Sequence, residues 1–368
     1  MQEHSPFSGF FGSFVKSALN PVLAPRADTI FPCPLSGDLT WEAKDVFNPA
    51  AIVHDGRVHL LYRAEDYEGK HAGTSRIGLA TSEDGVNFTR EPHPVLFPAD
   101  DEFRELEWEG GCEDPRVVQA PDGTYVLTYT SFNGEKALQC VATSSDLRFW
   151  KKHGPAFHEA HGGKYATRWS KAGAIVTELQ GEALVAKRIG GKYWMYWGES
   201  DVFAATSDDL IHWEPVEKGF GFDQRVLSQV DALYNSEKTC AAHETAPVFA
   251  TRPGRFDSGL VEQGPPVLWT EEGILMIYNS SNDGSDTSLR PDTYAPGWVV
   301  LDAKDPTAVI ARCTEPFLIP DALYERGGQA DRDCIFAEGL VFLGGRWLLY
   351  YGCGDRFIGV AASDPSRT

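Results

Sequence analysis

The sequence predicts an all-β fold, a five-bladed β-propeller with a central active-site cavity, and the first reason is a strand pattern that recurs along the chain. In each copy a tight turn opens a run of residues with strong strand preference, rich in aromatic side chains. Copies separated by about 67 to 82 residues indicate a radial or stacked repeat. The copies are HDGRVHLLYRAE (54–65), PDGTYVLTYTS (121–131), GGKYWMYWGE (190–199), TEEGILMIYNS (270–280) and LGGRWLLYYGC (343–353).

The second reason is that each copy has companion strands. An incoming strand precedes every turn, and an outgoing strand with a shared ending follows most of them. A fourth strand from the linking segment would complete a propeller blade. The incoming strands begin at Phe47, Cys112, Lys171, Glu262 and Ala337. The outgoing strands are GLATSEDGVNF (78–88), VATSSDLRFW (141–150), AATSDDLIHW (204–213), VVLDAKDP (299–306) and GVAASDP (359–365).

The order of these pieces predicts how the ring closes. The last unit ends at Pro365, which leaves too few residues for its outermost strand, and the segment before Phe47 has no unit of its own. We therefore expect N-terminal residues, around Pro32 to Trp41, to complete the final blade and remove an open edge. An open solenoid would need polar capping repeats, and the sequence contains none.

Composition supports one body that binds a neutral or cationic ligand. The repeat runs without a linker, so residues 1–368 are interpreted as one domain with an N-terminal extension over 1–46. Hydrophobic content of 42% suffices for a core, and no window approaches 18 uncharged apolar residues, so we expect no membrane span. A net charge of -20 and a pI near 4.9 argue against nucleic acid or an anionic membrane as partner.

The cysteines and the N-terminus indicate a reducing compartment. The seven cysteines form no C-x-x-C pair, so neither a zinc site nor a disulfide framework is predicted, and we expect no metal or other cofactor. The N-terminal segment is apolar but lacks a basic region, which favours a docking segment or helix over a signal peptide. We expect the cytoplasm, with the periplasm as the alternative, and the sequence leaves homo-oligomerisation open.

Aligning the repeats gathers polar side chains at one mouth of the central channel. The starts of incoming strands and the ends of aromatic strands lie at the same end of an antiparallel pair, so both sets face one opening. The aligned starts carry Asn48, Glu113 with Asp114, Lys171, Glu262 and Glu338. The aligned ends carry Arg63 to Glu65, Ser131, Glu199, Asn279 and Asp355.

This mixture of groups is typical of a carbohydrate site. Carboxylates, amides and arginine bind sugar hydroxyls, aromatic rings pack on sugar C–H faces, and no histidine pattern suggests a metal. Hydrolysis of a glycosidic bond needs one protonated and one ionised carboxyl, and Glu199 and Glu262 are candidates for that pair. Crowded acids would raise the pKa of at least one of them by like-charge repulsion.

Several motifs resemble glycoside hydrolase family 130, five-bladed propeller enzymes that act on β-mannosides. The resemblance spans about Phe47 to Pro365 apart from one insertion, and the family contains both phosphorylases and inverting hydrolases. The motifs that carry it are FNPAAIV, LLYRAED, IGLATSEDGVNF, GGCEDPRVV, GKYWMYWGE, RPGRFDSGLVEQGPPV and LLYYGCGD.

The resemblance implies a role for particular residues. Glu199 and Glu262 match the paired glutamates of the β-1,2-mannosidase branch, and Asp114 matches the proton donor of the phosphorylases, which acts through a sugar hydroxyl. The positions that hold the mannose ring are matched by Asn48, Arg63, Asp114 and Asp355. Further candidates for substrate binding at the same mouth are Glu113, Arg116 and Lys171.

The resulting hypothesis is an exo-acting, inverting hydrolase that releases mannose from β-mannosides, with β-1,2-linked mannooligosaccharides as substrate. The first alternative is a β-mannoside phosphorylase that produces mannose 1-phosphate, and the second is a non-catalytic sugar-binding propeller. A phosphate dianion between Glu199 and Glu262 would be repelled unless several cations offset them. The equivalent positions of the five repeats carry different side chains. This favours one central active site, because a lectin would have a similar site in each blade. The sequence does not decide which glutamate is the acid.

Structural interpretations compete with these roles. Glu199 could cap a turn in solvent, Arg63 could pair only with Glu65, and Asp355 could cap the final turn. Residues 222–251 depart from the family pattern, and we interpret them as an insertion, a loop or short helix near the mouth or at a subunit contact. Such an insertion would affect linkage and chain-length preference.

Overall fold

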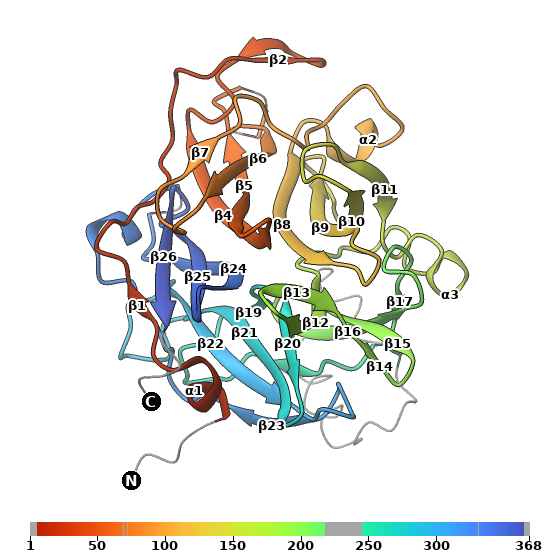
Figure 1. Ribbon diagram of the computed structural model, residues 1–368, viewed down its shortest axis with the longest axis vertical. Coiled ribbons are helices and arrows are strands. Elements are labelled where there is room, and N and C mark those ends of the chain that lie inside the picture. The colour runs from red at the N-terminus through yellow and green to blue at the C-terminus, as the bar shows by residue number, and fades with distance from the viewer. Residues whose placement is uncertain (1–5, 69, 72, 218–244, 330, 364–368) are drawn as a thin grey trace.

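Blades of mostly antiparallel β-strands lie around a common centre in the computed structural model of the chain (Figure 1). The structure describes residues 6–68, 70–71, 73–217, 245–329 and 331–363. The inner strands β4, β8 and β24 lie near the middle of the ring, and later strands of each sheet lie further out. The predicted five-bladed propeller is therefore confirmed.

The first two blades are regular four-stranded sheets, as the repeat predicts. In both blades the first strand lies at the centre, and every strand pairs with the one that follows it in the chain. The strands of the first blade are β4 (Asp45–His54), β5 (Arg57–Glu65), β6 (Ser75–Ser82) and β7 (Thr89–Arg90). Those of the second are β8 (Gly111–Gln119), β9 (Tyr125–Phe132), β10 (Ala137–Ser144) and β11 (Lys151–Pro155).

The third blade contains a hairpin that the sequence pattern did not predict. Its inner strand β12 pairs with the aromatic strand β15 only at Ala174 and Ile175, and then continues into a hairpin with β13. That hairpin pairs in parallel with β8 of the second blade and β20 of the fourth. The strands are β12 (Ala174–Gln180), β13 (Ala183–Ala186), β14 (Arg188–Ile189), β15 (Lys192–Trp197), β16 (Asp201–Ser207) and β17 (Glu214–Pro215).

The fourth blade has an interrupted inner strand. Both β19 and β20 pair with β21, and the break between them contains Pro265 and Pro266, which cannot donate backbone hydrogen bonds. A short strand, β18, precedes them and pairs with β16. The strands of the fourth blade are β19 (Leu260–Gln263), β20 (Val267–Thr270), β21 (Gly273–Ser281), β22 (Tyr294–Leu301) and β23 (Val309–Arg312), and β18 is Phe249–Ala250.

The last blade is completed by the N-terminus, but not by the residues that we expected. Its strands β24 (Ile335–Leu343), β25 (Arg346–Cys353) and β26 (Phe357–Ser363) are joined at the outer edge by β1 (Val15–Lys16). The expected segment, Pro32 to Trp41, instead contributes a separate hairpin of β2 (Phe31–Cys33) and β3 (Gly37–Leu39). That expectation was wrong because a strand of two residues leaves no periodic signal in the sequence.

Hydrophobic packing between neighbouring blades holds the ring together. The buried apolar side chains of the described residues form five clusters, and each cluster joins two adjacent blades. Trp197, for example, packs between the second and third blades, and Tyr278 packs between the third and fourth. The cluster between the fifth and first blades includes Tyr62 and Tyr350, so the ring is closed by side-chain packing as well as by β1.

Short helices lie at the periphery. Helix α1 (Pro6–Phe11) buries Phe7 and Phe11, and Phe7 stacks on Trp298 with ring centroids 5.4 Å apart. The N-terminal apolar segment therefore docks as a helix, as expected. The other helices in the part of the chain that the structure describes are α2 (Arg104–Glu107), α3 (Ala160–Gly163) and the 3-10 helix η2 (Leu323–Glu325). No helix in the described part of the chain is both long and apolar enough to cross a membrane.

The shared ending of the outgoing strands forms a repeated turn. In the first blade, Ser82 Oγ accepts the Gly85 backbone N–H at 2.9 Å, and Asp84 Oδ1 accepts the N–H groups of Val86 and Asn87 at 2.9 and 2.8 Å. Such side-chain to backbone bonds fix a turn locally. The equivalent pairs are Ser144 with Asp146 and Ser207 with Asp209. These acids are therefore structural and lie outside the candidate site.

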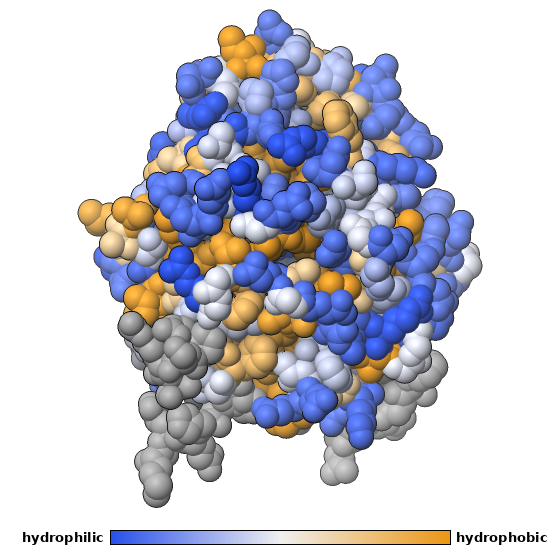
Figure 2. Space-filling model, viewed as in Figure 1, coloured by the Kyte–Doolittle hydropathy of each residue, from blue (hydrophilic) through white to orange (hydrophobic). Residues whose placement is uncertain are grey.

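Most of the expected insertion, residues 222–251, lies outside the described residues, which resume at Thr245. The described end of it contains the short strand β18. The face of the molecule that is viewed in Figure 1 is largely covered by hydrophilic side chains, with apolar side chains exposed in small patches between them (Figure 2). This surface suits a polar ligand better than an apolar one.

Candidate active site

Irregular backbone at the inner strands builds the floor of the site. The register shifts within β4 between Phe47 and Pro49, and within β8 between Glu113 and Arg116. The residues inside these two bulges, Asn48 and Asp114, have φ angles of 46° and 47°. Asn and Asp tolerate this left-handed conformation better than most residues, and bulges redirect side chains next to active sites. The two bulges thus take Asn48 and Asp114, both predicted site residues, out of the regular pairing of their strands.

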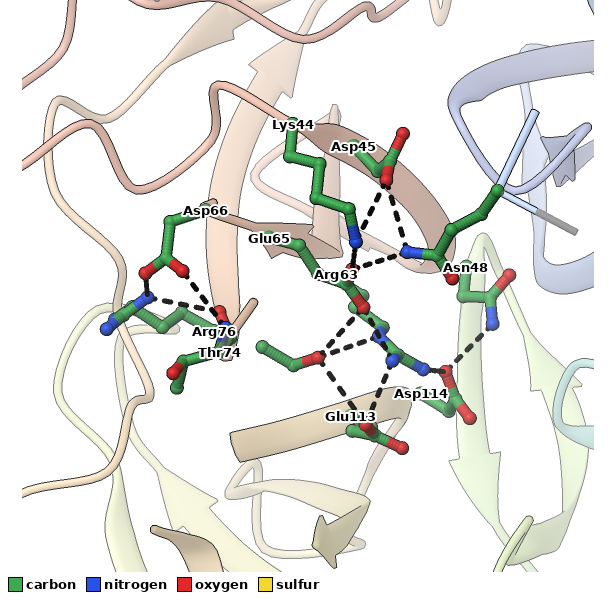
Figure 3. Close-up of polar contacts among 12 residues, drawn as sticks. Lys44, Asp45, Asn48, Arg63, Glu65, Asp66, Thr74, Arg76, Glu113 and Asp114 are labelled. Atoms are coloured by element: carbon green, nitrogen blue, oxygen red, sulfur yellow. Dashed lines mark hydrogen bonds and ion pairs between the residues drawn. The ribbon is translucent and has the colours of Figure 1, made fainter. Parts of the chain in front are cut away.

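Arg63 is the centre of an ionic network at the inner end of the first blade (Figure 3). Its Nη1 donates to Asp114 Oδ1 at 3.0 Å, and its Nη2 donates to Glu65 Oε1 at 2.7 Å and to Glu113 Oε1 at 2.9 Å. The Nε group donates to Ser75 Oγ at 3.0 Å. Arg63 therefore joins the first two blades, and pairing with Glu65 is only part of what it does.

Asp114 is held as an anion by its neighbours. Asn48 Nδ2 donates to its Oδ1 at 2.8 Å, and Lys171 Nζ lies 4.0 Å from its Oδ2 (Figure 3 shows the first of these contacts). Burial acts to raise the pKa of Asp114, but Arg63 and Lys171 outweigh it and hold that pKa below its ordinary value. An ionised Asp114 can accept a hydrogen bond from a sugar hydroxyl.

Glu113 differs from Asp114 although it is the adjacent residue. Burial raises the pKa of Glu113 to about 7, against the pull of Arg63 and with the repulsion of Asp114. Two neighbouring carboxyls with separated pKa values share the positive charge of one guanidinium. Of the pair, Asp114 carries the charge and Glu113 holds a proton more readily.

Glu199 and Glu262, which come from different blades, are backbone neighbours. Their residues form an isolated antiparallel bridge between the end of β15 and strand β19. Glu199 is exposed, and Trp169 Nε1 donates to its Oε2 at 3.3 Å. Glu262 is only 3% exposed, and burial raises its pKa to about 7, with Lys171 opposing and Glu199 adding to the rise. The two glutamates are therefore adjacent, but the side chain of Glu262 is buried and that of Glu199 is exposed.

Lys171 is surrounded by the acids of the site. Burial acts to lower its pKa, but Glu262, Glu199 and Asp114 outweigh burial and raise the pKa of Lys171 above its ordinary value. Its backbone carbonyl accepts the Gly198 N–H at 3.0 Å, which ties its position to the end of the aromatic strand. Lys171 thus stays protonated and offsets part of the negative charge around it.

Arg116 is committed to protein groups. Its Nε donates to Gly264 O at 2.9 Å, and its Nη2 donates to Gln263 O at 2.6 Å. The same Nη2 lies 3.0 Å from Glu338 Oε1 and 3.8 Å from Glu262 Oε1. Arg116 therefore fastens the second blade to the fourth and fifth beneath the site, rather than presenting free donors to a ligand.

Asp355 extends the site to the fifth blade. Its backbone has a φ of 52°, and Cys334 Sγ lies 3.5 Å from its Oδ1. Burial raises the pKa of Asp355, while Arg332 and Arg63 pull it down and Asp114 adds to the rise. Arg63 and Asp114 thus act on the charge of Asp355, as they would if all three residues faced one bound sugar.

All nine predicted site residues thus form one connected set, and the structure adds two that the sequence reasoning missed. Trp169 contacts Glu199, and the Tyr294 ring lies 5.0 Å from the Arg332 guanidinium carbon. Burial raises the pKa of Tyr294 to about 12, with Arg332 opposing the rise and Glu262 and Asp355 adding to it. Trp169 lies two residues before Lys171, so proximity to a predicted residue was its only signal. Tyr294 opens an outgoing strand and carried no signal.

A cavity of about 400 Å³ adjoins the Arg63 network. Among the residues that line it are Arg63, Glu65, Glu113, Lys44 and Phe132. It offers carboxylates, cations and an aromatic ring to a ligand, as a sugar requires. Among the described residues, no group of three or more His, Cys, Asp or Glu side chains is arranged to hold a metal ion.

Comparison with known proteins identifies the family. Residues 23–366 match a family model named Glyco_hydro_130 and described as beta-1,4-mannooligosaccharide phosphorylase. The chain belongs to glycoside hydrolase family 130. It is therefore a member of a family of mannoside-acting enzymes, as its motifs indicated.

Relatives within family 130 include both phosphorylases and hydrolases. The chain is 31% identical over 350 residues to a 1,2-beta-oligomannan phosphorylase of Thermoanaerobacter sp., covering 93% of this chain and 94% of that protein. A glycosyl hydrolase of Bacteroides ovatus is similar in structure, with a TM-score of 0.88, 44% identity, and coverage of 97% of this chain and 95% of that one.

Another solved structure has a TM-score of 0.88, 42% identity, and coverage of 97% of this chain and 95% of that one. It is described by the statement that the GH130 family of mannoside phosphorylases contains glycoside hydrolases that target beta-1,2 mannosidic linkages in Candida mannan. Membership of the family alone therefore does not decide between water and phosphate as the nucleophile.

Proposed function

We propose that the protein is an exo-acting, inverting β-mannosidase that hydrolyses β-1,2-linked mannooligosaccharides and releases mannose. The observation that carries this proposal is the bridge between Glu199 and Glu262, which brings two carboxyls of unlike burial together beside Lys171. An inverting glycosidase needs one carboxylic acid to protonate the leaving oxygen and one carboxylate to activate water.

Glu262 is the better candidate for the general acid. It is buried, and its pKa of about 7 leaves a large share of the side chain protonated near neutral pH. Glu199 is exposed, so water can reach its carboxylate. Glu113 has a similar pKa, but Arg63 Nη2 occupies its Oε1 at 2.9 Å, so it is less free to transfer a proton.

Residues of the first, second and fifth blades bind the mannose ring in this proposal. Asn48, Arg63, Asp114 and Asp355 carry amide, guanidinium and carboxylate groups that suit sugar hydroxyls. The low pKa of Asp114 favours a hydrogen-bond acceptor over a proton donor. This supports a mechanism in which Glu262, rather than Asp114, supplies the proton.

Charge balance supports water over phosphate as the nucleophile. Lys171 already faces Glu262, Glu199, Asp114 and Glu113, so a phosphate dianion would enter a region of excess negative charge. Arg116 makes its hydrogen bonds to backbone carbonyls. The structures described in terms of glycoside hydrolases are also 44% and 42% identical to the chain, against 31% for the oligomannan phosphorylase.

Phosphorolysis is the second candidate, because the named curated relatives are mannoside phosphorylases and Lys171 is a cation next to the acid pair. The test is to incubate the protein with β-1,2-mannobiose in phosphate-free buffer and in buffer with inorganic phosphate. Free mannose without phosphate supports hydrolysis. Turnover only with phosphate, giving mannose 1-phosphate, would overturn the proposal in favour of the second candidate, and binding without any turnover would indicate a sugar-binding protein.

A further inference from the structure

A cavity of about 820 Å³ lies at the outer edge of the second blade. Its walls come from strand β11, the turn between β9 and β10, and the segments around helices α2 and α3, which flank β11 in Figure 1. None of the residues that line it has a role in the mechanism above. Small-molecule sites measure about 300 to 1,000 Å³, so this cavity has room for more than one sugar ring.

The inner end of this cavity adjoins the active site at two places. Asn133 lines it, and the preceding residue, Phe132, lines the cavity beside Arg63. Thr167 also lines it and comes two residues before Trp169, whose indole N–H donates to Glu199 at 3.3 Å. A chain that leaves the active site past Phe132 or Trp169 therefore reaches this cavity next.

The outer end of the cavity continues onto the third blade. Glu159 and His212 line both this cavity and a smaller one of about 220 Å³, which is also lined by Lys192 and Thr206. Because the two cavities share wall residues, they adjoin each other. We call these two adjoining cavities the outer groove, and it leads from the active site toward the periphery of the third blade.

The outer groove offers polar groups that the fold does not use. Four exposed side chains along it make no hydrogen bond or ion pair with any described residue, and these are Glu135, Lys136, His158 and Glu159. Carboxylate, ammonium and imidazole groups in this state can bond to sugar hydroxyls. Phe103 and Leu106, both partly exposed, add apolar surface on which the C–H face of a sugar can pack.

The charges of the groove favour a neutral ligand. In the larger cavity the carboxylates of Glu102, Glu135 and Glu159 outnumber the ammonium group of Lys136, so a phosphate-rich ligand would be repelled. Three histidines also line this cavity, but in the part of the chain that the structure describes no group of three or more His, Cys, Asp or Glu side chains is arranged for a metal ion. A neutral polyhydroxyl chain fits these walls.

We propose that the outer groove binds the reducing-end units of a chain of β-1,2-linked mannose units whose non-reducing end occupies the active site. This inference rests on the proposed function, because it assumes an exo-acting enzyme that removes the terminal unit. A disaccharide is too short to reach far into the groove, whereas each further unit of a longer chain adds contacts along it. The preferred substrate is therefore a chain of several units.

The test is the ratio of kcat/KM for β-1,2-mannohexaose to kcat/KM for β-1,2-mannobiose in phosphate-free buffer. We expect a ratio of about 10 or more in the wild type, as one or two additional hydrogen bonds imply. The double variant His158→Ala/Glu159→Ala removes two of the unused polar groups, so the ratio should fall by about five- to tenfold, through a higher KM for mannohexaose. A ratio equal to that of the wild type would overturn the inference.

Two further variants control for unspecific effects. Glu271→Ala/Glu272→Ala removes two exposed carboxylates in the turn between β20 and β21, outside the groove, and should keep the wild-type ratio. Thr167→Trp fills the inner end of the groove with a larger side chain and should lower the ratio. If His158→Ala/Glu159→Ala does not fold by circular dichroism, an unchanged ratio in Thr167→Trp overturns the inference instead.

The outcomes separate this inference from the proposed function. Turnover of mannobiose by the wild type tests the function, and the ratio tests the groove. If turnover requires phosphate, hydrolysis fails, but the same ratio measured with phosphate still decides about the groove. If the wild type neither converts nor binds mannobiose, both fail together. An unchanged ratio accompanied by a changed oligomeric state on size-exclusion chromatography would show that the groove is a subunit contact, which also overturns the inference.

Discussion

Two fully or nearly buried glutamates, Glu42 and Glu262, lie beside arginine side chains, but their surroundings are opposite. Glu42 accepts hydrogen bonds from Thr29 and Tyr62 at 3.0 Å each and from Arg90 at 2.8 Å, and Arg26 lies 3.1 Å away. Glu262 is 3% exposed, its Oε1 receives no hydrogen bond, and Arg116 is 3.8 Å away.

The difference separates a carboxylate that holds the fold from one that is available for chemistry. The bonds to Glu42 join the segment before β4 to the first blade, so both of its oxygens are used by the structure. Glu262 is left with unmet hydrogen-bonding capacity and a raised pKa, which is the state of a proton donor.

The largest expected effect is on turnover by Glu262→Gln. Glutamine keeps the shape of the side chain but cannot donate a proton to the leaving oxygen, so kcat should fall by about 10² to 10⁴. Glu42→Gln, the matched control, should keep kcat within about threefold of wild type, since Glu42 bonds to Thr29, Tyr62 and Arg90, which are not residues of the candidate site. Steady-state kinetics with β-1,2-mannobiose measure both. An equal loss of kcat in the two variants would contradict the different roles of Glu42 and Glu262.

A smaller effect is expected in the pH dependence of stability. The pKa of Glu262 rises from 4.5 to about 7 on folding, so its contribution is present at low pH and is lost as pH rises through 7, by up to about 3 kcal/mol. Glu262→Gln should therefore gain stability relative to wild type at pH 8 compared with pH 5. Glu42→Gln should lose about 1 to 3 kcal/mol at both pH values, because it disrupts satisfied buried bonds.

Urea unfolding of the three proteins at pH 5 and pH 8 tests this prediction. If Glu262→Gln is destabilised equally at both pH values, then Glu262 is ionised throughout and is not the acid. The comparison uses differences between variants, so effects of other acids such as Glu113 cancel.

The smallest effect is expected at Trp169, which donates to the exposed partner Glu199 at 3.3 Å. Trp169→Phe keeps an aromatic ring but removes the indole N–H, and we expect kcat/KM to fall by about three- to tenfold, as the loss of one hydrogen bond to a carboxylate implies. Trp150→Phe offers a control, because the Trp150 indole N–H bonds only to the Leu147 carbonyl in a turn. Similar values for both variants would mean that the Trp169 contact does not position Glu199.

Sequence reasoning located the blades and the meeting of the two glutamates, because both follow from strand order. Glu199 ends an aromatic strand and Glu262 begins an inner one, so antiparallel pairing placed them at one mouth, and the bridge between their residues agrees with this. The sequence predicted that N-terminal residues complete the last blade, but the prediction named the wrong residues. The strand that does so, Val15–Lys16, is too short to show strand periodicity.

Other features depend on tertiary contacts that no local pattern encodes. The direction of the Arg116 side chain is set by carbonyls of Gln263 and Gly264, almost 150 residues away in the chain. The lack of hydrogen bonds to Glu338 is likewise visible only once five blades are assembled. In the sequence, Glu338 aligns with Glu262 at the start of an inner strand. That alignment predicted where Glu338 lies but not what it does.

The most direct measurement of the central claim is the anomeric configuration of the first product, followed by proton NMR of β-1,2-mannobiose hydrolysis in phosphate-free buffer. If Glu262 protonates the leaving oxygen while Glu199 activates water on the opposite face, α-mannose should form first and then mutarotate. The appearance of β-mannose first, or the absence of any mannose until phosphate is added, would contradict the account.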